Sequence, residues 1–560
     1  MSYGKVDDYS NSAQNSTQNL MPQGGYQQQY GAPAYPPQGH PQHQYGQQQQ
    51  QYNQYNQYQQ NPQQYQPQPY AAPYNAPNYQ QQNYPPPQAP PPQQGSGEKF
   101  AKTSKYKDLW AAIVFLLTMA AFAVCVVRGL TSLKFAKNNT GVTNPENNNA
   151  GNEFVVPPPA DLGGILAASV GTGFVLSVLY FVAMQKFAGK LIKVSMVLNV
   201  LVLAALAAYY AYQRQFAATI IMVLILGITA FFLWSCRSRI PLAKIVLKTV
   251  TKVTGQYPAT LFAGFMALVL IAIFNALWLA SFAGMMQYFE TNNSGNGLRY
   301  LTIVFMLFAL YYASQVISNV VHVTVSGLFA TYYFMGQPGG PQGKVTIPIK
   351  NPTAASAKRA LTTSFGSICF GSLVIAILQT IRAMLRMASQ EAAQDGNVVG
   401  ALCAACAGCC LGIIEGLIEY FNKWAFVQVA VYGKDYITAA KDTWRLCKTR
   451  GIDAIINDQL IGTVLGIGGL VVSFICGFVA FLYVRFSDNI PNNALHYAVF
   501  IILAVFLGAS EFFVLSNVID SGATATFVCL AEDPAALQRT KPELYEAIRA
   551  VYPQVAYPGV

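Results

Sequence analysis

Residues 311–334 read YYASQVISNVVHVTVSGLFATYYF, an apolar stretch that also carries Gln315, Asn319 and His322. It is long enough for a membrane-spanning helix, which needs roughly 20 mostly apolar residues. An amide or imidazole at membrane depth is costly unless it bonds to a neighbouring helix or faces water. We therefore expect a spanning helix whose polar side is covered by protein or lines a water-accessible cavity.

The polar side chains of this helix are expected to lie on one face, because steps of three or four residues return to the same side. They are Tyr312, Gln315, Asn319, His322, Ser326 and, two turns further on, Tyr333. A helix over residues 299–335 would measure about 55 Å, whereas the hydrocarbon core is about 30 Å thick, so it must tilt, break or project. Helix packing and a solute path both explain such a face.

The composition places the rest of the chain in the membrane class. Of 560 residues, 53% are hydrophobic and only 10% are charged, whereas a soluble chain carries about a quarter charged residues. The net charge of +11 could suggest a nucleic-acid partner. The basic residues, however, sit in short loops between apolar blocks, which fits membrane topology better and leaves lipids as the expected surroundings.

The apolar blocks predict an all-α, polytopic membrane protein with about ten spans. The expected spans are 109–130, 163–184, 191–212, 215–236, 259–286, 299–325, 361–386, 398–420, 460–484 and 495–518. Residues 1–98 are rich in Gln, Tyr and Pro and lack aliphatic residues, which predicts a disordered tail. Residues 99–535 then form the transmembrane domain, and residues 536–560 a short C-terminal tail.

Loop charges predict the orientation of these spans. Most of the 34 Lys and Arg residues fall on one side when both termini are placed in the cytoplasm, as the positive-inside rule requires. The sequons at Asn138 and Asn292 then lie in outer loops, where glycosylation occurs. Segments 239–253 and 432–451 are too polar to span, so we expect them to lie on the bilayer or cap the bundle at the cytoplasmic side.

Further polar groups within the spans are candidates for the same path as the 311–334 face. They are Asn275, Trp278, Glu415 and Glu511. An acid at membrane depth is a functional candidate by default, although the nearby pair Glu419 and Lys423 offers a structural alternative around Glu415. Aromatic rings and carboxylates suit a quaternary ammonium solute, and His322 is of a type that titrates near neutral pH.

Three other motifs favour packing over chemistry. In CAACAGCC (403–410), Cys403, Cys406 and Cys410 form a helix face of small side chains, and Ser367 and Gly371 form another. Such faces let membrane helices approach closely. GGPQGKVT (339–346) lacks the Ser or Thr of a nucleotide-binding loop. We therefore expect no metal, cofactor, nucleotide or catalytic residue.

Five ordered segments resemble the choline transporter-like family in its fungal branch. They are RSRIPLAKIVLK (237–248), SNVVHVTVSGLFATYYF (318–334), TSFGSICFGSL (363–373), EYFNKWAFVQVAVYGKDYITAAKDTW (419–444) and SGATATFVCLAEDP (521–534). The resemblance covers roughly residues 105–535. It implies a ten-span plasma-membrane carrier of choline or a related quaternary amine, with exchange for protons as one mechanism. One departure is loop 131–162, which is short and has no cysteine, unlike the large Cys-rich loop of animal members.

The leading hypothesis is therefore secondary or facilitated transport of a small organic cation across the plasma membrane. Two alternatives stay open. One is a membrane scaffold or sensor without transport activity, whose long tail recruits partners. The other, which we favour less, is an acyltransferase-type membrane enzyme that uses His322.

Overall fold

The computed structural model describes residues 105–132, 159–292, 296–337, 346–448, 452–487 and 494–553. The predicted tail 1–98, the sequon at Asn138 and most of the GGPQGKVT segment lie outside these ranges. The described chain is almost entirely helical, as the sequence predicts, with one isolated antiparallel bridge between Gln337 and Thr346. Nine helical segments of this described part are long and apolar enough to cross a membrane.

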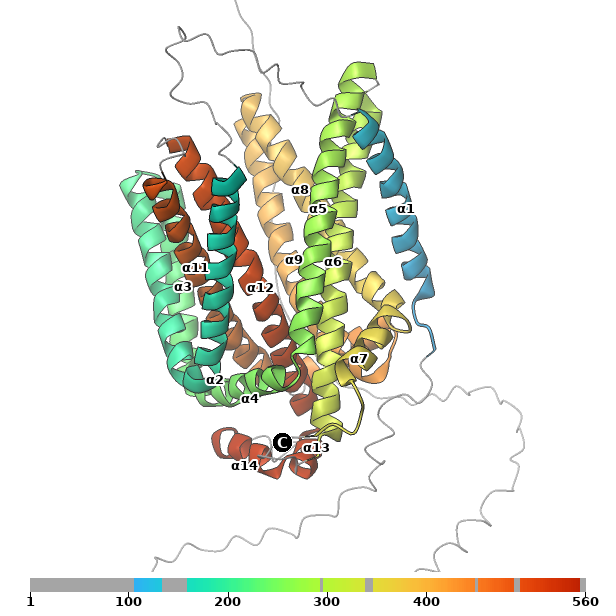
Figure 1. Cartoon of the computed structure of the whole chain (residues 1–560), viewed down its shortest axis with the longest axis vertical. Helices are drawn as coiled ribbons and strands as arrows, with labels where there is room; N and C mark the ends of the chain where they lie inside the picture. Colours follow the sequence, from blue (N-terminus) through green and yellow to red (C-terminus); the bar gives the residue numbers. More distant parts are fainter. Residues whose placement is uncertain are drawn as a thin grey trace, which may run out of the picture. The chain divides into compact units, whose positions relative to one another are not determined.

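The α-helices follow one another along the chain with short connections. Their bounds are α1 Leu109–Ser132, α2 Pro159–Tyr212, α3 Phe216–Cys236, α4 Ile240–Gln256, α5 Ala259–Asn292, α6 Asn296–Met335, α7 Pro352–Leu361, α8 Phe365–Gln394, α9 Val398–Tyr432, α10 Tyr436–Leu446, α11 Ile452–Phe486, α12 Ala494–Glu532, α13 Pro534–Thr540 and α14 Pro542–Val551. The long helices run side by side as one bundle (Figure 1).

Helix α2 contains two of the predicted spans. A straight helix of its 54 residues would be about 80 Å long, far more than one crossing needs. The backbone leaves helical geometry at Phe187, with φ −123° and ψ 26°, between the predicted spans 163–184 and 191–212. Figure 1 shows the two arms doubling back at the end of the bundle where α4 lies, so nine segments make ten crossings.

Helix α4 lies across one end of the bundle rather than through it (Figure 1). A short 3-10 turn, Arg237–Arg239, and Pro241 in the first turn of α4 redirect the chain out of α3. One face of α4 is buried, including Val246, Leu247 and Val250, while its lysines are exposed. This position agrees with the sequence expectation that segment 239–253 lies on the bilayer or caps the bundle rather than spanning it.

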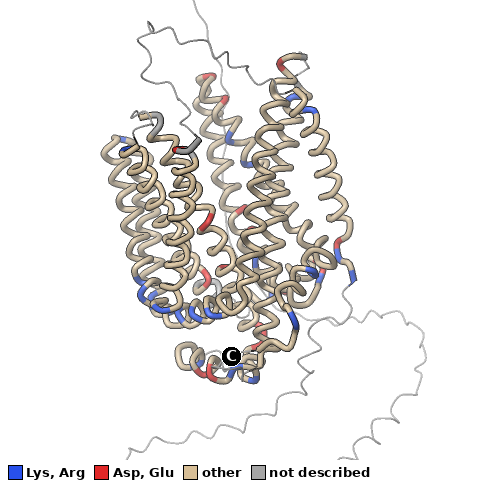
Figure 2. Tube along the Cα trace, viewed as in Figure 1, with Lys and Arg blue, Asp and Glu red and all other residues tan. Residues whose placement is uncertain are grey.

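Lys and Arg positions gather at this same end of the bundle, with fewer at the opposite end (Figure 2). The positive-inside rule therefore predicts that the α4 end faces the cytoplasm. Asn292, the second predicted glycosylation site, is the last residue of α5.

The C-terminal segment is folded rather than a simple tail. Helices α13 and α14 each begin with proline, and the Asp533 carboxylate accepts the Ala536 amide at 3.0 Å to cap α13. Leu537, Tyr545 and Ile548 are buried in the main hydrophobic core together with residues of α4 and α6. The segment therefore packs against α4 and against the end of α6.

Lys541, between α13 and α14, is buried against the end of α6. Its ammonium group donates to the carbonyl oxygens of Tyr332 at 2.5 Å and Tyr333 at 3.4 Å, and lies 4.2 Å from the Tyr332 ring centroid. Burial lowers the pKa of Lys541 to about 7. A lysine released into water regains its ordinary pKa of about 10.4.

We expect the docking of α13 and α14 to strengthen as pH rises from about 7 toward 10. Between these values the undocked segment binds more protons than the docked one, so raising pH favours docking. Amide exchange of residues 534–551, corrected for its intrinsic pH dependence, should slow over this window in wild type and stay level in Lys541→Met. A wild-type exchange rate that is level or rises would contradict the assignment.

The small-residue faces behave differently from one another. A Cβ added to Gly371 would lie 2.6–2.7 Å from side-chain atoms of Phe426, Asn422 and Tyr436, so α8 packs closely there, as expected. The four cysteines of CAACAGCC are all exposed, which makes their predicted packing against a helix of the described chain wrong. Helix α9 turns that side outward because its polar groups face inward.

Candidate functional site

The polar face of α6 bonds to two neighbouring helices. Asn319 Nδ2 donates to Ser372 Oγ of α8 at 3.0 Å and, more weakly, to Gln315 Oε1 at 3.4 Å. Gln315 Nε2 in turn donates to Glu419 Oε1 of α9 at 3.4 Å. These contacts join three helices through amide, hydroxyl and carboxylate groups at membrane depth.

His322 is buried on the same face and bonded at both ring nitrogens. Nε2 lies 2.8 Å from the Lys423 carbonyl oxygen, and Nδ1 lies 2.8 Å from Ser521 Oγ of α12. A carbonyl oxygen only accepts, so Nε2 carries a proton. A neutral His322 therefore accepts the Ser521 hydroxyl proton at Nδ1, and its tautomer is set by these two contacts.

An ion cluster lies directly beside His322. Lys423 Nζ is 2.7 Å from Asp520 Oδ2 of α12 and 3.3 Å from Asp458 Oδ2 of α11. The Tyr420 hydroxyl donates to Asp458 Oδ2 at 2.9 Å, and Thr524 Oγ1 donates to Asp458 Oδ1 at 3.1 Å. We call these five residues the Lys423 cluster, and with His322 they tie α6, α9, α11 and α12 together.

The Lys423 cluster carries excess negative charge and is partly open. One ammonium faces two carboxylates, so the cluster has a formal charge of −1 when both acids are ionised. Asp458 is only 1% exposed, but the side chains of Lys423 and Asp520 are 20% and 29% exposed. The Asp520 side of the cluster is thus partly exposed, whereas the Asp458 side is closed.

Helix α9 carries polar groups on successive turns, each matched to another helix. The Glu415 carboxylate pairs with Arg382 of α8 at 3.0 Å, Glu419 accepts from Gln315, and Lys423 holds the two aspartates. Further along, Gln428 Nε2 donates to Glu532 Oε2 at 3.1 Å. From 415 to 428 the row extends about 20 Å, two-thirds of the hydrocarbon thickness of about 30 Å.

Some predicted site residues lie away from this row. Trp278 Nε1 of α5 donates to the Met306 carbonyl at 2.8 Å, and its ring stacks on Phe282 at 5.0 Å. Met306 is 16 residues before His322 on α6, about 24 Å along the helix. Asn275 of α5 is exposed, and neither residue joins the Lys423 cluster.

Tyr312 and Ser326 lie on α6, on either side of Gln315, Asn319 and His322 along the chain. Tyr312 is fully buried, donates to the Ala111 carbonyl of α1 at 3.4 Å and packs edge-on against Phe115. Ser326 is also fully buried, and its hydroxyl has no hydrogen-bond partner among the described residues. Tyr312 therefore packs against α1, while Ser326 extends the polar face one turn beyond His322.

Glu511 of α12 faces helix α2, where a side chain at Gly173 would collide with its carboxylate. One carboxylate oxygen is buried without a hydrogen-bond partner among the described residues. Glu511 lies nine residues before Asp520, about 14 Å along α12. It is therefore a second acidic group on the helix that supplies Asp520, separate from the Lys423 cluster.

The sequence analysis missed Asp458 and Asp520. The predicted spans began at 460 and ended at 518, just short of both acids, because hydropathy falls where charges enter a helix. Both helices continue, with α11 starting at Ile452 and α12 ending at Glu532. The sequence instead suggested that Lys423 pairs with Glu419 one turn earlier, whereas in the structure Lys423 pairs with Asp458 and Asp520 and Glu419 accepts from Gln315.

Comparison with known proteins agrees with this architecture. Residues 220–535 match the family model described as plasma-membrane choline transporter. Protein PNS1 of Cryptococcus neoformans (strain JEC21) is 34% identical over 473 residues, covering 82% of this chain and 84% of the relative. Protein PNS1 of Gibberella zeae is 35% identical over 467 residues, with coverages of 82% and 84%. Protein PNS1 of Neurospora crassa is 35% identical over 465 residues, with coverages of 80% and 81%.

A multi-pass helical bundle with polar and charged side chains joined across its interior is typical of a membrane transporter. The chain belongs to the choline transporter-like family. The resemblance noted from the five sequence segments is thereby confirmed.

Proposed function

We propose that this protein carries a small organic cation, choline or a related quaternary amine, across the plasma membrane. The observation that carries the proposal is the Lys423 cluster, in which two carboxylates face one ammonium between four helices and the Asp520 side chain is 29% exposed. A carboxylate attracts the charge of an ammonium solute, and aromatic rings add cation–π attraction. Tyr420 supplies one such ring, with Lys423 Nζ 5.9 Å from its centroid.

Lys423 then acts as an internal counter-ion for the two aspartates. Its ammonium holds Asp520 at 2.7 Å, in the position where a solute cation would interact with the same carboxylate. A solute that approaches from the open side would compete with Lys423 for Asp520. Exchange of one cation for another at a carboxylate is the kind of two-state element that a secondary or facilitated mechanism needs.

A transporter explains the His322 environment better than an enzyme does. A Ser–His pair at 2.8 Å resembles a nucleophile and its base. However, Ser521 is fully buried and His322 is only 5% exposed, so an acyl substrate has no access to the hydroxyl. The contacts instead join α6, α9 and α12, and we assign His322 a positioning role beside the Lys423 cluster.

Asp520→Asn is expected to raise the KM for choline by about tenfold with little change in the maximal rate. The variant keeps the side-chain shape but removes the charge that the solute meets, and tenfold corresponds to about 1.4 kcal/mol. The measurement is uptake of labelled choline and ethanolamine by proteoliposomes. Asp395→Asn, which removes an exposed carboxylate after α8, is the matched control.

Two results would argue against the proposal. If wild type takes up none of the labelled amines, the substrate class is wrong. If Asp520→Asn and Asp395→Asn have the same KM, transport occurs but its solute does not meet the Lys423 cluster.

A further inference from the structure

Helix α10 presents two different sides. Ala439 and Thr443 are buried against the bundle, and Tyr436, which is 9% exposed, lies at the border between the two sides. The opposite side is exposed and carries Ile437 and Trp444, which are 49% and 56% exposed. Exposed apolar surface of this size costs free energy in water, roughly 25 cal/mol per Å², so this side needs a partner.

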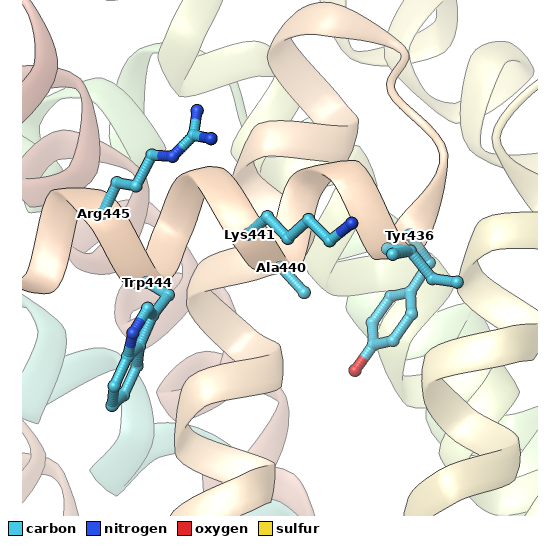
Figure 3. Close-up of a pocket in the computed structure, with 6 residues that line it drawn as sticks. Tyr436, Ala440, Lys441, Trp444 and Arg445 are labelled. Carbon is cyan, nitrogen blue, oxygen red and sulfur yellow. The ribbon is translucent and has the colours of Figure 1, made fainter. Parts of the chain in front are cut away.

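The exposed side of α10 forms a shallow groove. Its volume is about 410 Å³, and it is lined by Tyr436, Ile437, Ala440, Lys441, Trp444 and Arg445. Figure 3 shows the rings of Trp444 and Tyr436 pointing to the same side of the helix, with the small Ala440 between them. The two rings form the walls and Ala440 the floor of an open, mostly apolar slot.

Cationic side chains border the slot. Lys441 is exposed next to Ala440, and Lys448 Nζ lies 5.3 Å from the Trp444 ring centroid. Arg445 pairs with Asp442 at 3.5 Å yet is 79% exposed. Residues 434–448 contain four basic and two acidic residues, so the groove has a net positive charge.

The position of α10 defines which surface it meets. Gly433, with φ +62°, ends α9, and the Asp435 carboxylate caps α10 by accepting the Thr438 amide at 3.0 Å. Three residues therefore separate α10 from the end of α9, which is long and apolar enough to span, and we place α10 at the membrane boundary. Tryptophan concentrates at this boundary, and juxtamembrane basic residues attract anionic lipids by about 1 kcal/mol each.

From these observations we infer that the α10 groove binds one anionic phospholipid of the adjacent leaflet. An acyl chain lies between Trp444 and Tyr436, and the phosphate with its anionic headgroup is held by Lys441 and Lys448. A soluble anion would not need the apolar slot, and an apolar partner alone would not need the cations. A phospholipid with an anionic headgroup satisfies both halves of the groove.

The inner wall of the groove is rigid. The Tyr436 ring packs on Phe370 at 5.0 Å and on Phe426 at 6.1 Å, and its backbone amide donates to Asp108 Oδ2 at 2.8 Å. The same carboxylate oxygen accepts from Ser367 Oγ at 2.7 Å. The slot is thus formed before the lipid arrives, which reduces the entropic cost of binding.

The test measures binding of fluorescent phosphatidylserine to the purified full-length protein in neutral detergent, with fluorescent phosphatidylcholine as the uncharged comparison. Lys441→Gln with Lys448→Gln should weaken phosphatidylserine binding about thirtyfold, since two basic side chains are lost. Lys350→Gln with Lys358→Gln is the matched control, because both lysines are exposed near α7. This control should bind phosphatidylserine like wild type. Neither double variant should change the melting temperature.

A third variant tests the apolar half. Trp444→Ala keeps every charge but removes one wall, and it should weaken phosphatidylserine binding by about tenfold. Equal binding by all variants would overturn the inference, as would equal loss in the Lys350 and Lys358 control. Complete displacement of the lipid by inorganic phosphate or by soluble polyglutamate would also overturn it, because the apolar slot would then contribute nothing.

Discussion

Lys423→Met is expected to lower the free energy of unfolding by about 3–5 kcal/mol, the usual cost of removing one partner from a buried ion pair. The variant keeps a similar side-chain length but leaves two carboxylates facing each other. Asp458, only 1% exposed, would lose its cation in a place that water barely reaches. Unfolding of the detergent-purified protein by heat or denaturant measures the loss.

The control for Lys423→Met is an exposed ion pair. Arg549 and Glu546 lie 3.5 Å apart with side chains 50% and 59% exposed, and such pairs contribute about 0–1 kcal/mol. Arg549→Met should therefore change stability little. If Lys423→Met is as mild as Arg549→Met, then the Lys423 cluster is not a buried electrostatic junction.

A second substitution separates charge from packing. Asp458→Asn in the Lys423→Met background removes the stranded carboxylate, while the amide oxygen can still accept from one of the two hydroxyls of Tyr420 and Thr524 and the amide NH2 can donate to the other. We expect the double variant to recover at least half of the lost stability. Failure to recover would mean that Lys423 acts through its aliphatic stem rather than through its charge.

The spans could be predicted because the bilayer imposes their length and composition. Helices α1, α5, α8 and α12 coincide with predicted apolar spans. Helical periodicity also predicts that the lysines of α4 share one face. The sequence predicted two separate spans in the α2 region. It did not predict that a bend at Phe187 would join them, since the sequence there carries no proline. The C-terminal helices were missed because their burial depends on α4 and α6, which are distant in sequence.

The candidate site shows what periodicity alone can and cannot predict. It placed Gln315, Asn319 and His322 on one face of α6, and the structure bonds all three across that face. It could not predict which helices lie opposite, so Trp278 was grouped with His322 although it bonds to Met306. The partners of Lys423 come from α11 and α12, and only the packed bundle brings them together.

Gly284→Val is expected to cost about 3 kcal/mol or more, because overpacking forces the backbone to move. Helices α1 and α5 approach so closely that a Cβ at Gly284 would overlap the Gly129 carbonyl, and one at Gly129 would overlap the Ser281 carbonyl. Both obstacles are backbone atoms, which cannot rotate away as a side chain can. Small residues at such crossings let membrane helices pack by direct backbone contact.

The expected result of Gly284→Val is separation of α1 from the bundle rather than a uniform loss of stability. Cys125 on α1 is partly buried, so its rate of thiol labelling, followed by peptide mapping, should rise in the variant. Gly227→Val is the matched control, since nothing lies within 4 Å of a Cβ at Gly227 on α3. Unchanged Cys125 labelling and a melting temperature equal to that of Gly227→Val would show that α1 and α5 do not meet at these glycines. Labelling that rises only in Gly284→Val would locate the contact at this crossing, because both variants add the same side chain to a spanning helix.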